Sequence, residues 1–139
     1  MINSFDSKYA FLSNFYECKV EYNGITYGSS EAAFQAQKAR NAEERLRFAE
    51  LSPMASKKLG RKIELRTDWE EVKLAEMYHI VLAKFTQNPD LAEKLIATGD
   101  KELIEGNYWR DTYWGVCGGE GLNCLGKILM KVRGELSKK

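Results

Sequence analysis

The alternation of apolar and polar residues predicts a β-hairpin in the first third of the chain. Apolar residues at 18, 20 and 22 alternate with charged residues, and Asn23-Gly24 separates them from a second extended run at 25–27. An Asn-Gly pair between two such runs is a strong hairpin signal, because both turn residues must adopt a positive φ. We therefore expect a small antiparallel element here.

Helical patterns cover most of the remaining chain. Residues 28–30 offer a hydroxyl N-cap to the first predicted helix, and Asp68 with Glu71 has the form of a capping box for the longest one. The middle of that longest helix, 77–85, is apolar on nearly every face and contains His79, which indicates a central buried helix with a semi-buried histidine. The predicted helices cover residues 30–40, 42–51, 53–60, 69–86, 89–98 and 123–136.

The C-terminal third combines an irregular segment with a final amphipathic helix. A short strand at 101–107 is followed by a segment rich in glycine and aromatic residues at 108–123. The last helix then places apolar residues at 125, 128, 129 and 132 on one stripe. A length of 139 residues suits one domain. We expect a helix-dominated α+β fold, a single domain over 1–139 with a small N-terminal antiparallel hairpin or sheet.

The charge balance narrows the possible partners. Lys and Arg number 21 against 20 Asp and Glu, so the formal net charge is +1. That balance removes the strong electrostatic case for non-specific binding to nucleic acid or to a membrane surface, although a local basic patch stays possible. No apolar run is long enough to span a membrane, and residues 1–6 do not resemble a signal peptide. We expect a cytoplasmic protein.

The cysteine and histidine content argues against a metal site. Cys18, Cys117 and Cys124 form no CxxC pair, and the chain has a single histidine. A structural zinc site needs four such ligands at characteristic spacings. We interpret the cysteines as reduced and mostly buried thiols, and we expect no metal and no organic cofactor.

The first predicted helix carries the best candidates for catalysis. Glu31, Gln35 and Lys38 follow one another at i, i+4 and i+7, which puts a carboxylate, an amide and an ammonium on one face. Glu31 would lie in the first turn, where the helix dipole favours the ionised form that suits a general base or a stabiliser of positive charge. The alternative is a solvated helix face with a weak Glu-to-Lys pair.

A second candidate lies in the irregular segment. Asp111 is surrounded by Trp109, Tyr113 and Trp114, and such an apolar setting raises the pKa of a carboxyl toward working pH. The same aromatic residues could stack on a flat heterocycle. The alternative is an aspartate that caps a turn beside core tryptophans.

Two further segments bear on substrate binding. Asn14 belongs to the polar pair that interrupts the apolar segment 11–16, either at the edge of a pocket or in a simple turn. The run 57–62 concentrates cations without an acid between them, including Arg61 and Lys62. It is either a phosphate-binding corner or an ordinary solvated helix end.

Taken together, these segments resemble the NADAR family of N-glycosidases. The matching pieces occur in family order over nearly the whole chain, at 11–16, 29–39, 60–62, 66–69, 84–85, 98–100, 111–115 and 123–130. The resemblance implies hydrolysis of a bond between a ribose C1′ and a nitrogen. The implied substrates are the phosphorylated ribosylamino-pyrimidine intermediates of riboflavin biosynthesis, or ADP-ribosylated guanine in nucleic acid. The chain departs from the family pattern at Trp109 and Arg110, where leaving-group specificity could change.

The resemblance also favours particular site residues. Glu31 and Asp111 are the expected stabiliser, base or acid, with interchangeable roles, because N-glycoside cleavage builds positive charge on the ribosyl ring. Lys38 would bind phosphate or attack C1′, although the neighbouring Glu31 opposes the lowered pKa that attack requires. The expected substrate-binding residues are Trp114, Trp69, Asn14, Gln35, Arg61 and Lys62, with Trp114 stacking on the base and Arg61 and Lys62 holding phosphate. A non-catalytic module that binds ADP-ribose or a related nucleotide is the alternative function.

Overall fold

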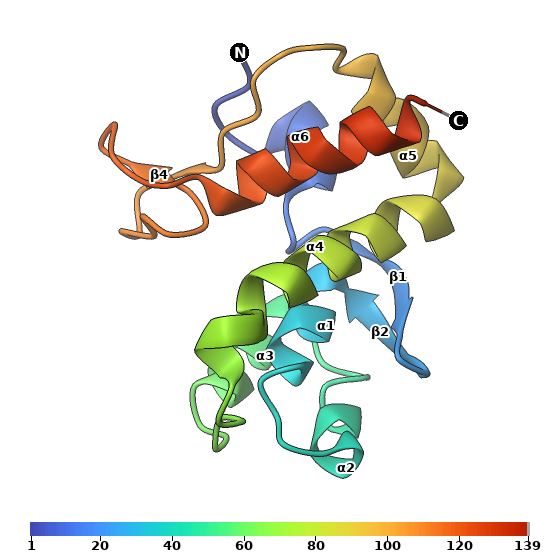
Figure 1. The fold of residues 1–139 in the computed structure, drawn as a ribbon, viewed down its shortest axis with the longest axis vertical. Helices are drawn as coiled ribbons and strands as arrows, with labels where there is room; N and C mark the ends of the chain where they lie inside the picture. Colours follow the sequence, from blue (N-terminus) through green and yellow to red (C-terminus); the bar gives the residue numbers. More distant parts are fainter. Residues whose placement is uncertain (139) are drawn as a thin grey trace. The chain divides into compact units, whose positions relative to one another are not determined.

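The computed structural model describes residues 1 to 138, and the chain divides into two compact units (Figure 1). The central unit is Asn14–Asn88, and the terminal unit joins Met1–Ser13 to the chain from Pro89 onward. The central unit contains the strands β1 (Glu17–Tyr22) and β2 (Ile25–Ser29) and the helices α1 (Ser30–Ala36), α2 (Ala42–Leu46), α3 (Pro53–Gly60) and α4 (Trp69–Gln87). The terminal unit contains the 3-10 helix η1 (Ser7–Leu12), α5 (Pro89–Ala97), β3 (Gly106–Asn107), β4 (Val116–Cys117) and α6 (Cys124–Leu136).

The predicted hairpin is confirmed. Strands β1 and β2 pair antiparallel, and the turn between them has φ 51° at Asn23 and 85° at Gly24. These positive values are those that a two-residue turn requires. Val20 and Tyr27 from the two strands are cross-strand partners and are fully buried. The hairpin thus contributes one apolar face to the core of the central unit.

Helix α1 is the most deeply buried element of the central unit. It lies against α3, α4 and both strands, and all of its residues are buried (Figure 1). Ser29 caps its start, with Oγ accepting from the N–H of Ala32 at 3.0 Å, as the sequence predicted. The helix ends at Ala36 rather than at 40, because the chain tightens there: the Lys38 N–H bonds to Gln35 three residues back.

Helix α4 differs from its prediction in two respects. Its buried side is one face that includes Met77, Ile80 and Phe85, whereas His79 is exposed, so the expected all-round burial and the semi-buried histidine are wrong. The expected capping box is also absent, because the Asp68 side chain makes no cap bond and pairs with Arg66 instead. A strong cationic partner two residues away replaces the backbone N–H as its hydrogen-bond donor.

The terminal unit is built around α5 and α6, which pack together. The predicted apolar stripe of α6 is buried at 125, 128, 129 and 132, which confirms it. The predicted strand at 101–107 is reduced to β3, which pairs in parallel with β4, and to an isolated bridge between Leu103 and Ile2. Asn123 supports this region with φ 55°, donating from Nδ2 to the Leu103 carbonyl at 2.9 Å.

Three smaller expectations are corrected by the structure. Helix α2 ends at Leu46 and is continued to residue 50 by turns rather than by the helix predicted to 51. The three cysteines are free thiols but are partly exposed rather than mostly buried. The segment 11–16 begins inside η1 and continues as a turn. No helix within residues 1–138 combines the length and the apolar content needed to cross a membrane.

Candidate active site

A buried carboxylate with a fixed orientation lies at the start of α1. Glu31 is 8% exposed and Gln35 is 6% exposed, and Gln35 Nε2 donates to Glu31 Oε2 at 2.7 Å. The Glu31 N–H donates to the Asn14 carbonyl at 3.0 Å, which holds its backbone as well. Hydrogen bonds to the ionised form favour that form of a carboxyl group. The pair is therefore an oriented carboxylate rather than the solvated helix face that the sequence left open.

The other end of the Gln35 amide lies against α3. A Cβ built on Gly60 would overlap with Gln35 Oε1, and this buried oxygen has no hydrogen-bond partner. The opposite amide orientation would place an oxygen against the Glu31 carboxylate and is excluded by repulsion between the two acceptors. Gly60 thus leaves room for the one orientation in which Gln35 supports Glu31.

Lys38 lies two residues beyond α1 and is half-buried. Burial lowers the pKa of its ammonium, Glu31 partly restores it, and the cations of Arg61, Lys57 and Lys73 lower it further. The net direction is downward, so the expectation that Glu31 would prevent a lowered pKa is wrong. Desolvation outweighs the neighbouring carboxylate because the amine is partly removed from water.

The cations around Lys38 come from two elements of the central unit. Lys57 belongs to α3, Arg61 directly follows it, and Lys73 belongs to α4. Lys57 Nζ lies 5.8 Å from the centre of the Phe15 ring, and Lys73 Nζ pairs with Glu70 at 2.7 Å. This group of positive charges is suited to a phosphate. The sequence analysis did not single out Lys73. Its position four residues after Trp69, on the same face of α4, could have indicated that it lies near the candidate site.

Trp69 is buried and packs on α1. Its ring centroid lies 5.2 Å from that of Phe34, and the two rings are tilted by 53°. The tryptophan therefore supports the helix that carries Glu31 and Lys38. Its direct contact with substrate stays a prediction.

Asn14 holds the beginning of α1 in place. Its Oδ1 accepts from Ser30 Oγ at 2.9 Å, and its Nδ2 donates to Met77 Sδ at 3.4 Å. Together with the carbonyl that receives the Glu31 N–H, these contacts use both ends of the side chain. Asn14 therefore supports the backbone at Glu31. The expected contact of Asn14 with substrate stays a prediction.

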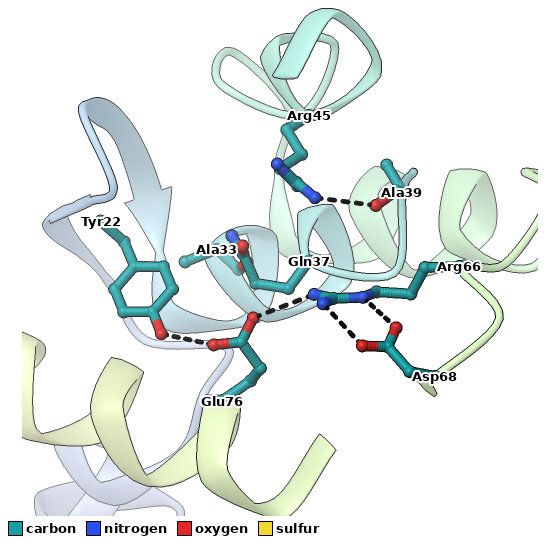
Figure 2. Close-up of polar contacts among 8 residues, drawn as sticks. All are labelled: Tyr22, Ala33, Gln37, Ala39, Arg45, Arg66, Asp68 and Glu76. Atoms are coloured by element: carbon teal, nitrogen blue, oxygen red, sulfur yellow. Dashed lines mark hydrogen bonds and ion pairs between the residues drawn. The ribbon is translucent and has the colours of Figure 1, made fainter. Parts of the chain in front are cut away.

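A network of polar side chains braces the same unit (Figure 2). The Arg66 guanidinium donates to both carboxylate oxygens of Asp68, at 2.6 and 3.1 Å, and to Glu76 at 3.4 Å, while Tyr22 OH donates to Glu76 at 2.6 Å. The network joins the hairpin, the loop before α4 and α4 itself. Hydrogen bonding to Asp68 raises the pKa of Arg66, and burial followed by Glu76 raises that of Tyr22.

The same network reaches the candidate site through the backbone. The Arg66 N–H donates to the Lys38 carbonyl at 2.9 Å. Next to it, Arg45 donates to the Ala39 carbonyl at 3.1 Å (Figure 2). Gln37 donates to the Ala33 carbonyl at 2.9 Å. These bonds fix the chain where α1 ends, and sequence analysis did not single them out. The two residues joined by each of these bonds are 4 to 28 positions apart in the sequence. Helical periodicity relates residues three or four positions apart, so it could not predict most of these bonds.

Asp111 occupies a turn in the terminal unit. Its Oδ1 accepts from the N–H groups of Tyr113 and Trp114 at 3.1 and 2.9 Å, so the aspartate does cap a turn. Trp114 is half-buried and meets the Tyr113 ring edge to face, with centroids 4.8 Å apart. One carboxylate oxygen of Asp111 thus serves the local fold.

The predicted site residues are divided between the two units. Glu31, Gln35, Lys38, Trp69, Asn14, Arg61 and Lys62 belong to the central unit, and Asp111 and Trp114 belong to the terminal unit. Within the central unit, the structure brings Glu31, Gln35 and Lys38 together and adds Arg61 beside Lys38, while Lys62 is exposed. The pairing of Glu31 with Asp111 stays a prediction. Residues 1–138 contain no group of three or more His, Cys, Asp or Glu side chains that could hold a metal ion.

Comparisons with known proteins identify the relatives of the chain. The family model of the NADAR domain matches residues 2–137. A Vibrio vulnificus protein named riboflavin biosynthesis protein VVA0006 is 41% identical over 138 residues, which cover 96% of this chain, and this chain spans 37% of that protein. N-glycosidase YbiA of Escherichia coli is 38% identical over 133 residues, or 93% of this chain and 82% of its own length. N-glycosidase Npun_R5314 of Nostoc punctiforme is 38% identical over 136 residues, with 92% and 86% covered.

A solved structure supports the fold. The NMR structure of Escherichia coli YbiA superposes with a TM-score of 0.86 at 34% sequence identity, covering 99% of this chain and 88% of that one. This match and the elements described above confirm the helix-dominated α+β fold with a small antiparallel strand pair.

Proposed function

Because the chain belongs to the NADAR domain family and is an N-glycosidase, we propose that it hydrolyses the ribose C1′–N bond of phosphorylated ribosylamino-pyrimidine intermediates of riboflavin biosynthesis. The name of the Vibrio vulnificus relative supports this substrate class. Membership in a family of hydrolases speaks against the alternative of a module that binds ADP-ribose without cleaving it. The observation that carries the proposal is the buried, oriented Glu31 carboxylate beside Lys38 and its neighbouring cations.

Glu31 would stabilise the charge that develops during bond cleavage. As the bond between C1′ and the nitrogen breaks, the ribosyl ring acquires oxocarbenium character, and an ionised carboxylate nearby lowers the energy of that state. The hydrogen bond from Gln35 fixes the Glu31 carboxylate before the substrate arrives, so little reorganisation accompanies the reaction. The same carboxylate could activate the attacking water.

Cations near Lys38 would hold the substrate phosphate. Arg61, Lys57 and Lys73 carry positive charges close enough to lower the pKa of Lys38, and a dianionic phosphate would relieve the repulsion among these four cations. Lys62 directly follows Arg61 in the sequence and is exposed, so we propose it as a further phosphate ligand. Phosphate binding would position the ribose and supply the affinity that a small heterocycle alone lacks.

We also propose roles in the reaction for Asp111 and Trp114, which the sequence analysis singled out. The second carboxylate would protonate the leaving nitrogen or activate water while Glu31 takes the other role. Trp114 would stack on the pyrimidine ring. The Asp111 turn keeps these two residues in a fixed relation, because the Trp114 N–H donates to Asp111 Oδ1.

One observation favours a covalent variant of this mechanism. The lowered pKa of Lys38 increases the neutral fraction of its amine. In that variant the amine lone pair forms a bond to C1′, the bond from C1′ to the leaving nitrogen breaks, and a proton moves from the amine to that nitrogen. Opening of the ribose ring then gives an iminium, which water hydrolyses. Borohydride reduction during turnover would add the sugar mass to the wild type and not to Lys38→Arg.

A mass-spectrometric hydrolysis assay tests the proposed substrate. The purified protein is offered a ribosylamino-pyrimidine phosphate and, separately, DNA with ADP-ribosylated guanine. The proposal predicts release of ribose 5-phosphate from the first. Release of ADP-ribose alone would replace the metabolite with modified nucleic acid as the substrate of the same reaction.

A further inference from the structure

Two large aromatic side chains lie exposed next to each other on the loop that follows β3. Tyr108 is 88% exposed and Trp109 is 51% exposed, and their rings meet edge to face with centroids 5.1 Å apart. Exposed aromatic rings forgo the favourable free energy that burial of their apolar surface would give. Neighbouring exposed aromatic rings are therefore a feature of binding surfaces.

Hydrogen bonds of the Asn107 side chain fix the ends of the loop that carries these two rings. Asn107 Oδ1 accepts from the Asp111 N–H at 3.1 Å, and Asn107 Nδ2 donates to the Asp111 carbonyl at 2.9 Å. The two bonds close a short loop of residues 108–110, which we call the aromatic tip. Arg110 within it has φ 67°, a left-handed conformation that a non-glycine residue adopts only when its surroundings impose it.

The base of the aromatic tip is braced on both sides. Asn107 Nδ2 also lies 3.1 Å from Glu105 Oε2, and Asp111 Oδ1 accepts from two backbone N–H groups that follow it. A loop held by this many bonds loses little conformational freedom when it binds a ligand. The tip is thus prepared for binding before a ligand arrives.

We propose that the aromatic tip binds a nucleobase that is carried next to a phosphate group. Flat heterocycles stack on indole and phenol rings, and such stacking accepts any base because every base has a π face. Arg110 is exposed in the same tip and offers a guanidinium to phosphate oxygens. The tip belongs to the other compact unit from Glu31, and its binding requires no turnover.

The size of the tip argues for this ligand over a protein partner. A stable protein interface buries roughly 800 Å² on each side. Two aromatic side chains bury at most about 500 Å² between them, and Trp109 is already half covered. A single base with its phosphate matches the tip in size, whether it comes from a free nucleotide or from an unpaired strand.

NMR titration of the full chain tests the proposal. The ¹H–¹⁵N spectrum is followed as thymidine 5′-monophosphate or a short oligothymidylate is added, with inorganic phosphate as a third arm. The Trp109 indole cross-peak, assigned through Trp109→Phe, is expected to move saturably with a base-containing ligand. Trp109→Leu and Tyr108→Leu should each weaken binding roughly tenfold or more, read from backbone amides. Leu122→Ala, which removes another exposed apolar side chain of the terminal unit, should bind as the wild type does.

The two nucleotide arms also distinguish the source of the base. Much tighter binding of the oligothymidylate per base assigns the tip to unpaired strands, and equal binding assigns it to free nucleotides. The proposal is overturned if neither ligand moves the Trp109 cross-peak at millimolar concentration, or if both leucine variants bind like the wild type. Equal shifts with inorganic phosphate alone would also overturn it, because the base would then contribute nothing.

Discussion

Gly60 packs against the amide oxygen of Gln35 so closely that a Cβ at position 60 would overlap with it. The other end of that amide donates to Glu31 Oε2 at 2.7 Å. A glycine at the end of α3 therefore helps to orient a carboxylate on α1, although it touches no reacting group. The backbone at Gly60 lies in the ordinary helical region, so the glycine is needed for space rather than for its φ.

Replacing Gly60 with alanine is expected to impair the reaction without weakening the helix. Alanine stabilises a helix by up to about 1 kcal/mol relative to glycine, but its methyl group would push the Gln35 amide away from Glu31. Without that hydrogen bond the Glu31 carboxylate is no longer held in one orientation before the substrate arrives, so it stabilises the transition state less well. We expect kcat at neutral pH to fall roughly tenfold, measured with the phosphorylated substrate.

Gly134→Ala provides the matched control, because Gly134 is also helical and a Cβ there would meet nothing within 4 Å. Its kcat should equal that of the wild type. An unchanged kcat in Gly60→Ala would show that Gln35 does not act through Glu31.

The substrate phosphate provides a second test. Arg61→Ala should raise KM for the phosphorylated substrate roughly tenfold with little change in kcat, because a hydrogen bond between charged groups is worth about 1.5–3 kcal/mol. The dephosphorylated substrate should be bound equally by variant and wild type. Lys58→Ala, an exposed neighbour in α3, should leave both KM values unchanged. An equal effect of Arg61→Ala on both substrates would remove Arg61 from the phosphate site.

Stability should depend on pH through Lys84. This lysine is 1% exposed, with Nζ 5.2 Å from the Phe85 ring centre and 5.8 Å from that of Tyr16, and burial lowers its pKa to about 8. A lysine with a lowered folded-state pKa binds protons less readily when folded. The free energy of unfolding should therefore rise as pH increases from about 8 toward the unfolded value of 10.5.

Lys84→Met tests this expectation. The lowered pKa of Lys84 corresponds to about 3 kcal/mol at about 1.4 kcal/mol per pKa unit, so the variant should be more stable than the wild type at pH 7. Its free energy of unfolding should no longer rise with pH above about 8. Urea unfolding between pH 7 and 9.5 measures it, with the exposed Lys127→Met as control. A Lys84→Met protein that is less stable at pH 7 and keeps the rise would show that Lys84 is not its source.

The polar network of Figure 2 should contribute to stability through Tyr22. Tyr22→Phe removes the 2.6 Å hydrogen bond to Glu76 and should lower the free energy of unfolding by about 1 kcal/mol. Tyr108→Phe removes a hydroxyl from a side chain that is 88% exposed and should change it little. Chemical denaturation measures the free energy of unfolding of both variants and of the wild type. If Tyr22→Phe is as stable as Tyr108→Phe, the Tyr22–Glu76 hydrogen bond does not contribute to stability.

Local patterns in the sequence predicted the regular elements well. The Asn23-Gly24 turn, the Ser29 cap and the buried stripe of α6 each depend on residues a few positions apart, and all three are confirmed. The spacing of Glu31 and Gln35 predicted that the two side chains share one helix face, and the structure joins them by a hydrogen bond. Helical and strand periods capture such relations because they act within one element.

Interactions between elements account for what the sequence did not predict. Arg66 draws Asp68 away from its expected cap, and burial among neighbouring elements decides the direction of the Lys38 pKa. The overlap between Gly60 and Gln35 joins residues 25 positions apart. These effects depend on tertiary packing, which overrides local preference and carries no periodic signal.

The most direct measurement is the hydrolysis rate of Glu31→Gln on a ribosylamino-pyrimidine phosphate, followed by mass spectrometry. The side chain keeps its shape but loses the charge, so the variant should fold as the wild type does and turn over at least about 10²-fold more slowly. Asp111→Asn should show a loss of similar size if it is the partner carboxylate. Glu71→Gln, an exposed first-turn glutamate of α4, should retain full activity. Wild-type turnover by a folded Glu31→Gln protein would contradict the central role of this carboxylate.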